Sequence, residues 1–560
     1  MARHLITSAL PYINGVKHLG NLVGSMLPAD VYSRFLRQTG DEVLFICATD
    51  EHGTPAELAA LEAGMTTAAF CERQYRVMAE LCERWGLSFD HFGRSSSPQN
   101  AELTQHFASV LDDNGFIDVR TTVQAYSVDE QRFLPDRYVT GTCPHCGYDR
   151  ARGDQCENCT RVLDPADLIE PKSATSPAST VELRESKHLF LKQSQLADRI
   201  RAWIMSKDDW PPLSRSIALK WLDEGLQDRG ITRDLEWGIP VPGRWDGFEN
   251  KVFYVWFDAP IEYIGASKEW ADLEPGSRDW KSWWWEADDV RYTEFMAKDN
   301  VPFHAITFPA TLLASGEPWK LVDQLKSFNW LTYYGGKFST SQQRGVFMHD
   351  ALEVLPADVW RYFLIANAPE GDDADFTWQL VANAVNKDLA DVLGNFVNRT
   401  LKFHQAHFSN RDFLPTAGSV ENDLIEDLQQ DIDALRQMYK EMQFRKVAQH
   451  LRRIWSRGNE YLETTAPWKT VKTDADAAAN SIAVGVGLIR LFGYASAPVM
   501  PSIAATLLES VGASPTLVWP GDVRAIILEP VSQEAVKVPA PMFTKLLPED
   551  ISSYEERFGV

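Results

Sequence analysis

The sequence predicts an α/β fold with a parallel sheet, which a small metal-binding insertion interrupts and an all-α helix bundle follows. Three observations support this prediction. Short apolar runs alternate with helical periodicity over the first 115 residues. Four cysteines lie together between residues 143 and 159, and long amphipathic segments without strands begin near residue 376. At 560 residues the chain is too long for one hydrophobic core, which favours several domains.

The composition is that of an ordinary folded protein, with 44% hydrophobic and 24% charged residues. The net charge of −23 argues against nucleic-acid binding through bulk charge, although it leaves room for a local basic face. No run of eighteen apolar residues occurs, and the first residues pass into a predicted strand without a signal peptide. We therefore expect a cytoplasmic protein that makes no contact with a membrane.

The first predicted unit is a strand over residues 4–10, a helix over 22–36 and a second strand over 42–48, as in a βαβ unit. The turn before the helix contains His18, Gly20 and Asn21. Unpaired N–H groups and the positive end of the helix dipole make such a turn an anion site, to which His18 can donate a hydrogen bond. Gly20 would let a flat ring approach the backbone. The alternative is an ordinary connection between a strand and a helix.

Asp50 follows the second predicted strand, in the run Thr-Asp-Glu-His-Gly at residues 49–53. Ligands of open α/β sheets bind beyond the carboxyl ends of the strands, so Asp50 is expected on the same edge as His18. Its carboxylate could meet a cationic group of a substrate. The alternative is that it caps the helix predicted to begin near Pro55. Helices are predicted over residues 55–85 and 98–114.

The region 116–185 breaks the α/β pattern and contains two Cys-x-x-Cys pairs, nine residues apart, in Gly- and Pro-rich surroundings. This spacing predicts a tetrahedral four-thiolate zinc site at Cys143, Cys146, Cys156 and Cys159. Four thiolates leave no open position for water, so the metal should organise a loop without taking part in chemistry.

The α/β pattern resumes near residue 233. An aromatic strand is predicted over residues 251–257, ending in a turn at 258–263, and another strand over 301–308. The aromatic residues could wall an apolar pocket or simply belong to the core. A loop over residues 334–345 is rich in glycine and hydroxyl groups and contains Lys337, which suits phosphate contacts. The tryptophan-rich run at 280–285 has no evident chemical role.

Amphipathic helices are predicted over residues 378–407, 420–441, 443–465, 475–497 and 501–511. The segment 421–433 is acidic, and the helix after it predicts a local positive face from Arg445, Lys446, Arg452, Arg453 and Arg457. Trp468 beside a proline at the end of this helix suits stacking on an unpaired base, or else packs the end of the bundle.

Together these motifs resemble the methionyl-tRNA synthetases, a family of class I aminoacyl-tRNA synthetases, in the same order and over nearly the whole chain. They are the opening motif at residues 9–21, the Asp50 motif at 49–54, the zinc knuckle, Arg233-Asp-x-x-Trp-Gly, the aromatic run at 255–263, Lys298-Asp299 with Phe303-His304, the loop Lys337-Phe-Ser339-Thr340-Ser341, and the run from Asn459 to Trp468.

The resemblance implies a Rossmann-type catalytic domain and a role for each motif. It assigns the methionine pocket, with Asp50 binding the α-ammonium, to Leu10, Tyr12, Asp50, Trp256, Ala259, Pro260, Tyr263 and His304. It assigns ATP binding and catalysis to His18, Gly20, Asn21, Lys337, Ser339, Thr340 and Ser341, with Arg233 and Asp299 in support. Asn459 and Trp468 would contact the anticodon. The implied partners are L-methionine, ATP with magnesium, and tRNA(Met).

Several positions depart from the family pattern. Asn21 stands where the family usually has His, and Thr340 where it usually has a second Lys, so the ATP site lacks two basic groups. Gln342 and Gln343 lengthen the loop, and Asn300 stands where an apolar pocket residue is expected. These departures leave open a non-enzymatic tRNA-binding relative. Another class I synthetase is the other alternative, although no editing insertion is evident.

The resemblance also divides the chain into domains. These are the two halves of the catalytic domain (1–115 and 233–325), an insertion (116–232) with its knuckle (143–159), a region for the mobile loop and stem contacts (326–375), an anticodon-binding bundle (376–520) and a C-terminal tail (521–560). No appended dimerisation domain follows the bundle, so we expect a monomer.

Overall fold

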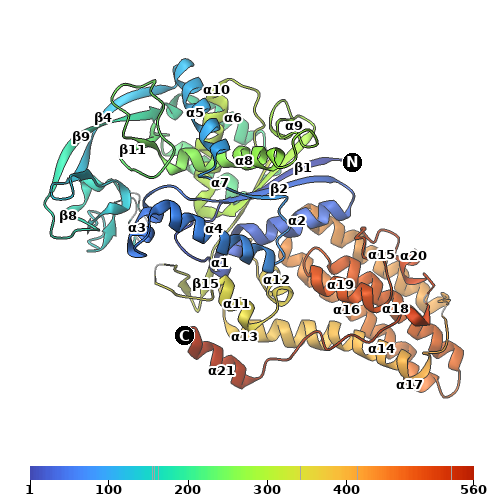
Figure 1. Cartoon of the computed structure of the whole chain (residues 1–560). Coiled ribbons are helices and arrows are strands. Elements are labelled where there is room, and N and C mark those ends of the chain that lie inside the picture. Colours follow the sequence, from blue (N-terminus) through green and yellow to red (C-terminus); the bar gives the residue numbers. More distant parts are fainter. Residues whose placement is uncertain are drawn as a thin grey trace.

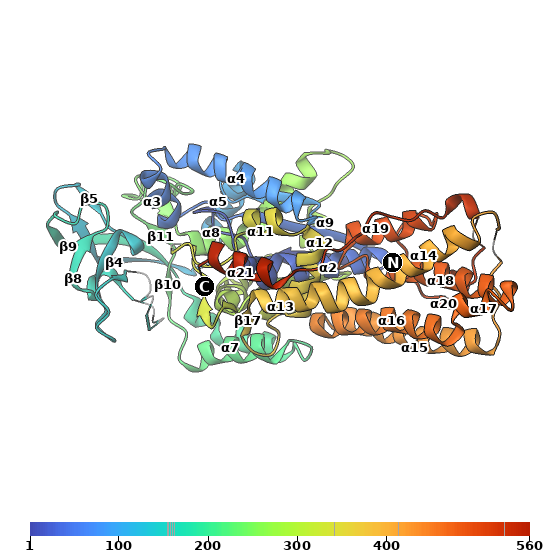
Figure 2. The same cartoon turned by 90° about the horizontal axis from the view of Figure 1, so that it is seen from below.

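The computed structural model describes residues 1–559 except 154, 155, 157, 160, 162, 341, 413 and 531. An α/β part and a helical part lie side by side (Figure 1). The small sheets of the insertion project from one end of the elongated molecule, and the helix bundle forms the other end (Figure 2). The predicted order of sheet, insertion and bundle is confirmed.

A five-stranded sheet forms the centre of the α/β part, and all its neighbouring strands are parallel. Its strands, in spatial order, are β14 (Gln324–Phe328), β13 (Val290–Ala297), β1 (Arg3–Ser8), β2 (Glu42–Thr49) and β3 (His91–Arg94). The chain moves outward from β1 through β2 to β3 on one side, and later from β13 to β14 on the other. The strand order therefore reverses between β1 and β13, where ligands of such sheets bind.

Three consecutive segments make up the helix predicted between the first two strands. They are α1 (Leu19–Asn21), the π-helical η1 (Leu22–Met26) and α2 (Leu27–Gln38). Helices α3 (Thr54–Glu62), α4 (Thr67–Arg84) and α5 (Pro98–Asp113) follow β2 and β3 as expected. The β1–helix–β2 unit predicted from the sequence is confirmed.

The insertion is built on a long antiparallel hairpin of β4 (Ile117–Ser127) and β9 (Val181–Leu191). Its far end, near the β8 label in Figure 1, bears a small sheet of β6 (Val139–Thr142), β7 (Ala151–Arg152) and β8 (Ile169–Ser173). The four cysteines lie in the loops between these strands. The other elements of this region are β5 (Arg132–Phe133), α6 (Ala197–Met205), α7 (Pro212–Asp223), β10 (Arg229–Gly230) and β11 (Thr232–Arg233).

Two predicted strands are wrong. The aromatic run at 251–257 forms only the short β12 (Val252–Phe253) before α8 (Val255–Asp272), and the run at 301–308 forms the π-helical η6 (Phe303–Thr307) and the start of α10 (Phe308–Ser315). Helix α8 is buried almost around its circumference, so its sequence is apolar without a clear helical period. The sheet strands on this side are β13 and β14, and neither they nor β3 on the other side were predicted from the sequence.

The tryptophan-rich run forms the short α9 (Lys281–Trp284), which packs against α8, β1 and β13. Trp284 is fully buried, and its Nε1 donates to the Ser267 hydroxyl at 2.8 Å. The guanidinium of Arg3 lies 4.3 Å above the Trp283 ring. These contacts give the run a packing role.

The elements between the sheet and the bundle are β15 (Leu331–Tyr333), β16 (Gly336–Lys337), α11 (Met348–Val354), α12 (Ala357–Ala366) and β17 (Ala374–Phe376). The bundle contains α13 (Trp378–Asn383), η7 (Ala384–Gly394), α14 (Asn395–His407), α15 (Ser419–Lys440), α16 (Phe444–Thr465), α17 (Pro467–Thr470), α18 (Ala475–Ser496) and α19 (Pro501–Ser510). The five predicted helices are confirmed.

Helix α18 is long and apolar enough to cross a membrane. However, 78% of its most apolar stretch is buried inside the protein, as in the core helix of a bundle.

The predicted positive face on α16 is wrong for three of its five residues. Arg452 pairs with Asp388 at 2.5 Å, Arg453 with Asp431 at 3.1 Å, and Arg457 with Asp427 at 2.6 Å. Asp427 and Asp431 belong to the acidic segment on α15, which packs along α16, whereas Asp388 lies on η7. These ion pairs join residues that are distant in the sequence, so the local charge pattern did not predict them.

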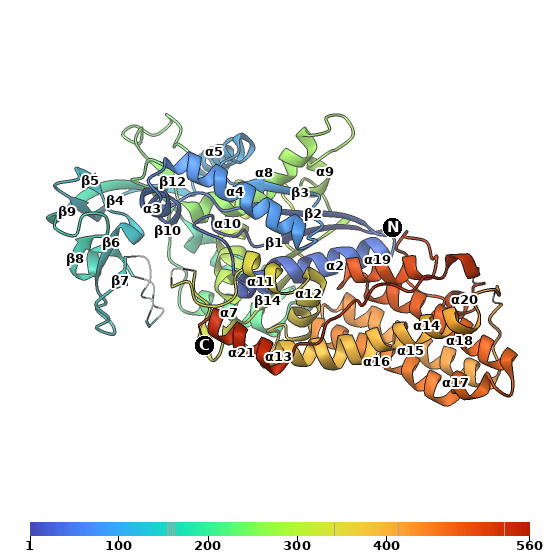
Figure 3. The same cartoon turned by 60° about the horizontal axis from the view of Figure 1, so that its bottom comes forward.

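The tail folds back along the bundle to the α/β part, as Figure 3 shows. It contains α20 (Val523–Ile527), the 3₁₀ turn η8 (Gln533–Ala535) and α21 (Pro548–Arg557), so its end is helical where an irregular segment was predicted. Glu555 accepts a hydrogen bond from the Tyr334 hydroxyl at 2.7 Å. The tail thus spans from the bundle to the β15–β16 hairpin.

Candidate active site

Two adjoining cavities lie beyond the carboxyl ends of β1 and β13, at the reversal of strand order. They share Ala9, Leu10, Tyr12 and Asn300. The inner cavity has a volume of about 30 Å³ and the outer one about 300 Å³. The turn after β1 and the turn after β13 supply the shared residues, so the topology of the sheet creates the site.

The inner cavity is apolar and aromatic, apart from one carboxylate and one imidazole. Its lining brings together every side chain predicted for the amino-acid pocket: Leu10, Tyr12, Asp50, Trp256, Ala259, Pro260, Tyr263 and His304. The ring of Trp256 stacks on Phe303 at 3.6 Å between centroids. This stack holds the Trp256 ring, which lines the cavity.

His304 and Tyr263 form a fixed polar chain at the back of the inner cavity. His304 Nδ1 donates to the Asn300 carbonyl at 2.9 Å, and Nε2 accepts from the Tyr263 hydroxyl at 2.9 Å. Burial lowers the pKa of His304 to about 4, so the ring is neutral at physiological pH. Asn300 stands where the family pattern has an apolar residue. It orients His304 through its backbone carbonyl.

Asp50 supplies the only carboxylate that lines the inner cavity in the described part of the chain. It is 4% exposed, and its Oδ1 has no hydrogen-bond partner among the described residues. Burial, reinforced by the neighbouring Asp258 and Glu51 carboxylates, raises the pKa of Asp50 well above its usual range. A buried acceptor without a partner is costly, and a cationic ligand would relieve that cost.

The outer cavity combines the start of α1 with the β16 hairpin. It contains His18, Gly20, Asn21, Asp299 and Lys337 from the prediction, together with Lys17, Ser25, Trp330 and Phe338, which the prediction did not single out. The His18 ring stacks on Phe338 at 4.9 Å, which joins the two halves of this cavity. A side chain at Gly20 would lie only 3.1 Å from His18 Nδ1, so glycine preserves the ring position.

His18 and Asn21 form a reciprocal cap at the start of the helix. His18 Nδ1 accepts from the Asn21 backbone N–H at 3.2 Å, and Asn21 Oδ1 accepts from the His18 backbone N–H at 3.2 Å. Because Nδ1 is an acceptor, the neutral ring carries its proton on Nε2. Burial and the nearby Lys17 ammonium lower the pKa of His18 to about 3, so the ring is a neutral donor. The Asn21 amide serves the cap.

The residues of the predicted phosphate loop divide between two places. Lys337 lines the outer cavity, with its Nζ 4.7 Å from the centre of the Trp330 ring. Thr340 instead lines a separate cavity of about 1050 Å³, on the side of Gly15 and the tail. Ser339 bridges to Arg344 through the backbone, and Ser341 lies outside the described residues. Among the described residues predicted to bind ATP from this loop, Lys337 alone lines the outer cavity with His18.

Arg233 lies outside both cavities. Its guanidinium is 3.6 Å from the Tyr254 ring centre and pairs with Asp136 at 3.2 Å. Nearby, the Trp237 indole donates to the Glu51 carbonyl at 2.7 Å, next to Asp50. Arg233 thus holds the insertion against the segment that precedes α8.

The four predicted zinc ligands cluster in the knuckle. Their sulfur atoms all lie within 4.8 Å of one another, with 3.9 Å between Cys143 and Cys159 and 3.6 Å between Cys146 and Cys156. A tetrahedral zinc with bonds of about 2.3 Å separates its thiolates by about 3.8 Å. The donor set therefore fits zinc, and the geometry matches the sequence prediction.

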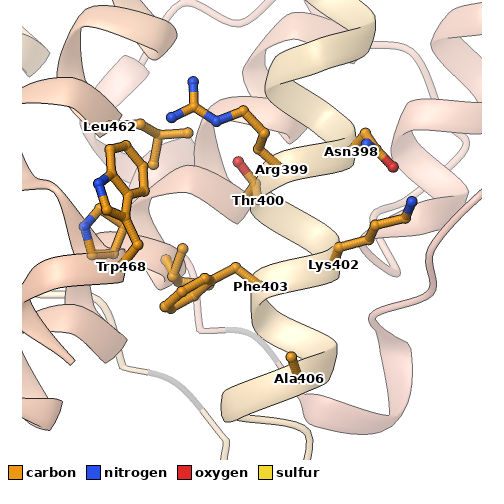
Figure 4. Close-up of a pocket in the computed structure, with 10 residues that line it drawn as sticks. Asn398, Arg399, Thr400, Lys402, Phe403, Ala406, Leu462 and Trp468 are labelled. Atoms are coloured by element: carbon orange, nitrogen blue, oxygen red, sulfur yellow. The ribbon is translucent and has the colours of Figure 1, made fainter. Parts of the chain in front are cut away.

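A further cavity of about 370 Å³ opens in the bundle between α14, α16, α17 and α18 (Figure 4). Trp468 and Phe403 contribute aromatic faces to it, and the Arg399 guanidinium lies 4.7 Å from the Trp468 ring centre. Asn459 does not line it, because its amide donates to the Val392 carbonyl at 3.0 Å within the bundle. Arg399 was not predicted for this site, because it lies on α14, 69 positions before Trp468 on α17.

Family comparisons agree with this arrangement. A family model for class I tRNA synthetases (M) matches residues 4–401, and a model for the anticodon binding domain of methionyl tRNA ligase matches residues 414–560. The methionine–tRNA ligases of Streptomyces avermitilis and Paracoccus denitrificans are each 57% identical to this chain, and each alignment covers 100% of this chain and 99% of the relative.

A solved structure has the same fold. The Mycobacterium tuberculosis methionyl-tRNA synthetase in complex with methionyl-adenylate superposes with a TM-score of 0.77 at 23% identity, over 98% of this chain and 100% of that one. At this identity the likeness concerns the fold alone. The full-length sequence matches carry the assignment: the chain belongs to the methionine–tRNA ligases, the class I aminoacyl-tRNA synthetases that join methionine to tRNA.

Proposed function

We propose that the two adjoining cavities are the methionine and ATP subsites of one adenylation centre, and that the bundle cavity reads the anticodon of tRNA(Met) in initiation and elongation. The observation that carries the proposal is the shared wall of Ala9, Leu10, Tyr12 and Asn300. This wall joins the apolar inner cavity, which contains the Asp50 carboxylate, to the outer cavity, which contains the start of α1 and Lys337. An amino acid and a nucleotide bound there would meet at this wall.

In the inner subsite, Asp50 binds the methionine ammonium and the aromatic walls bind the thioether. Sulfur is polarizable and makes favourable contacts with ring edges, which suits Trp256 and Tyr12. A cavity of about 30 Å³ holds little more than one or two waters, so Trp256 and Phe303 must separate to admit the side chain. His304 and Tyr263 close the far end.

In the outer subsite, the His18 Nε2–H donates to the phosphates, and Gly20 accommodates the adenosine. The methionine carboxylate oxygen bonds to the α-phosphorus, and the bond from that phosphorus to the pyrophosphate oxygen breaks. Lys337 stabilises charge that develops on the phosphates. Magnesium, when bound with ATP, supplies further neutralisation of the phosphates. Asp299 lines this subsite as a support.

The second step transfers the methionyl group from the adenylate to the terminal ribose of tRNA. We assign the anticodon to the bundle cavity, where Trp468 offers a ring for stacking. Arg399 lies beside this ring and pairs with Glu463 at 2.8 Å. Asn459 supports this cavity from within the bundle. The domain division predicted from the sequence, a monomeric state and a cytoplasmic location belong to the same proposal.

The two steps can be separated by isolating the adenylate. The chain, incubated with labelled methionine and ATP, should retain stoichiometric methionyl-adenylate through gel filtration, and adding tRNA(Met) should release the label as methionyl-tRNA. A chain that binds tRNA(Met) but forms no adenylate would be the non-enzymatic relative considered above.

Replacing Trp468 should separate anticodon recognition from chemistry. We expect Trp468→Ala to lower kcat/KM for tRNA(Met) about tenfold, because a stacked base is worth roughly 1–3 kcal/mol. The rate of ATP–pyrophosphate exchange should stay unchanged. Trp285→Ala removes a partly buried tryptophan far from the bundle and is the matched control. Equal losses in both reactions of Trp468→Ala would mean that this ring only packs the bundle.

Removing the metal should loosen the knuckle. We expect about one zinc per chain, released when a mercurial blocks the thiols, and a Cys146→Ser variant that retains much less. The knuckle has a small core around Leu134, Val139 and the buried Cys143 and Cys156, so its loops should become protease-sensitive without zinc. A metal-free chain with native protease resistance would contradict a structural role for zinc.

A further inference from the structure

The outer cavity contains a buried lysine that no motif assigned. Lys17 is 4% exposed and lines this cavity directly beside His18. Its Nζ donates to Asn14 Oδ1 at 2.9 Å, the one hydrogen bond that its ammonium makes in the described part of the chain. An ammonium has three donors, so a buried one with a single partner can offer others to a ligand.

The charges around this lysine favour an anion. The cationic side chains that line the outer cavity, within the described residues, are Lys17 and Lys337, while the adjacent His18 is neutral. The two basic residues usual in the family are replaced by Asn21, which is used in the helix cap, and Thr340, which lines another cavity. Lys17 therefore adds a cationic side chain to a cavity that lacks the two basic residues usual in the family.

Lys17 also lies close to the junction of the two subsites. It interacts electrostatically with Asp50 in the inner cavity, while its own side chain belongs to the outer one. Burial lowers the pKa of Lys17 to about 7, and Asp50 opposes this change. Binding of a polyanion would favour the charged form. Lys17 thus lies near the junction of the cavities, where a carboxylate and an α-phosphate would react.

We propose that Lys17 is a catalytic residue of adenylate formation that donates to the non-bridging oxygens of the α-phosphate. The proposal rests on the adenylation function assigned above. As the methionine carboxylate oxygen bonds to phosphorus, the bond to pyrophosphate breaks and its electron pair leaves with pyrophosphate. Lys17 transfers no proton; its charge stabilises the negative charge on the phosphorane oxygens.

The test is single-turnover formation of methionyl-adenylate by Lys17→Met, which preserves the length of the side chain without its charge. We expect about a tenfold lower rate at saturating ATP and methionine, with the KM for methionine within about threefold of the native value. Lys17→Gln keeps a donor for Asn14 without the charge, so it should show the same loss and takes the place of Lys17→Met if that variant does not fold. Lys326→Met is the matched control, because it removes a buried lysine that pairs with Glu370 outside the cavities.

Chemical rescue separates a catalytic charge from a structural one. Lys17→Ala should regain at least about threefold in rate with ethylammonium, and none with sodium at the same ionic strength. A native rate in Lys17→Met and Lys17→Gln, a loss confined to the KM for methionine, or an absence of rescue would each overturn the role of Lys17. A native chain that forms no methionyl-adenylate would instead overturn the proposed function.

Discussion

Replacing Asp50 by Asn should raise the KM for methionine about 100-fold. Asp50 is the carboxylate of the inner cavity and has a buried oxygen without a partner among the described residues. Without it, the methionine ammonium would be buried opposite a neutral amide, and losing one member of a buried ion pair costs roughly 3 kcal/mol or more. This cost corresponds to about 100-fold in affinity. Methionine-dependent ATP–pyrophosphate exchange measures it.

The pH dependence supplies the control for Asp50. Its pKa is raised in the free protein, so part of the population is protonated and must lose a proton before the ammonium binds. The KM for methionine should therefore fall as pH rises towards that pKa and become level above it. Asp50→Asn should abolish this slope. A variant that keeps both the native KM and the native pH profile would show that another group binds the ammonium.

Replacing Lys337 by Ala should lower the rate of adenylation by about tenfold or more, with little change in methionine binding. Its amine lies in the outer cavity opposite His18, where the proposed phosphates bind, and it takes no part in the inner cavity. A donor that acts on charge developing in the transition state changes kcat more than KM. Stopped-flow measurement of adenylate formation gives the rate directly.

Lys298 is a close control for Lys337. Its Nζ lies 4.4 Å from the centre of the same Trp330 ring, but it pairs with Asp373 at 2.7 Å and does not line the outer cavity. Lys298→Ala should therefore change the adenylation rate by less than about threefold. Unchanged exchange in Lys337→Ala, or equal losses in both variants, would be inconsistent with the role given to this loop.

Most residues of the candidate site could be predicted from the motifs. These motifs lie at the ends of strands and the starts of helices, which a parallel sheet brings together at one edge. Asp50 and His18 follow neighbouring strands, and Lys337 lies on a hairpin that packs against them. Trp256 and Tyr263 reached the inner cavity although a strand was predicted for residues 251–257. Helix α8 carries them instead, and its all-round burial removed the periodicity that identifies helices.

Other features depend on contacts that no local pattern contains. Arg452 and Arg457 form ion pairs with acidic residues on other segments, Asp388 and Asp427 respectively. Asn459 appeared suited to tRNA but donates to a carbonyl inside the bundle, while Arg399 reaches Trp468 from another helix. Lys17 could not be distinguished from an ordinary surface lysine, because its burial results from segments more than 300 positions away that close the outer cavity.

Amino-acid-dependent ATP–pyrophosphate exchange tests the central claim most directly. The claim is that one centre activates methionine with ATP despite the neutral Asn21 and Thr340. With methionine, leucine, isoleucine, valine and cysteine offered separately, the chain should exchange label with methionine alone, and Asp50→Asn should need far more methionine for the same rate. Exchange driven by another amino acid, or none with methionine, would contradict the account.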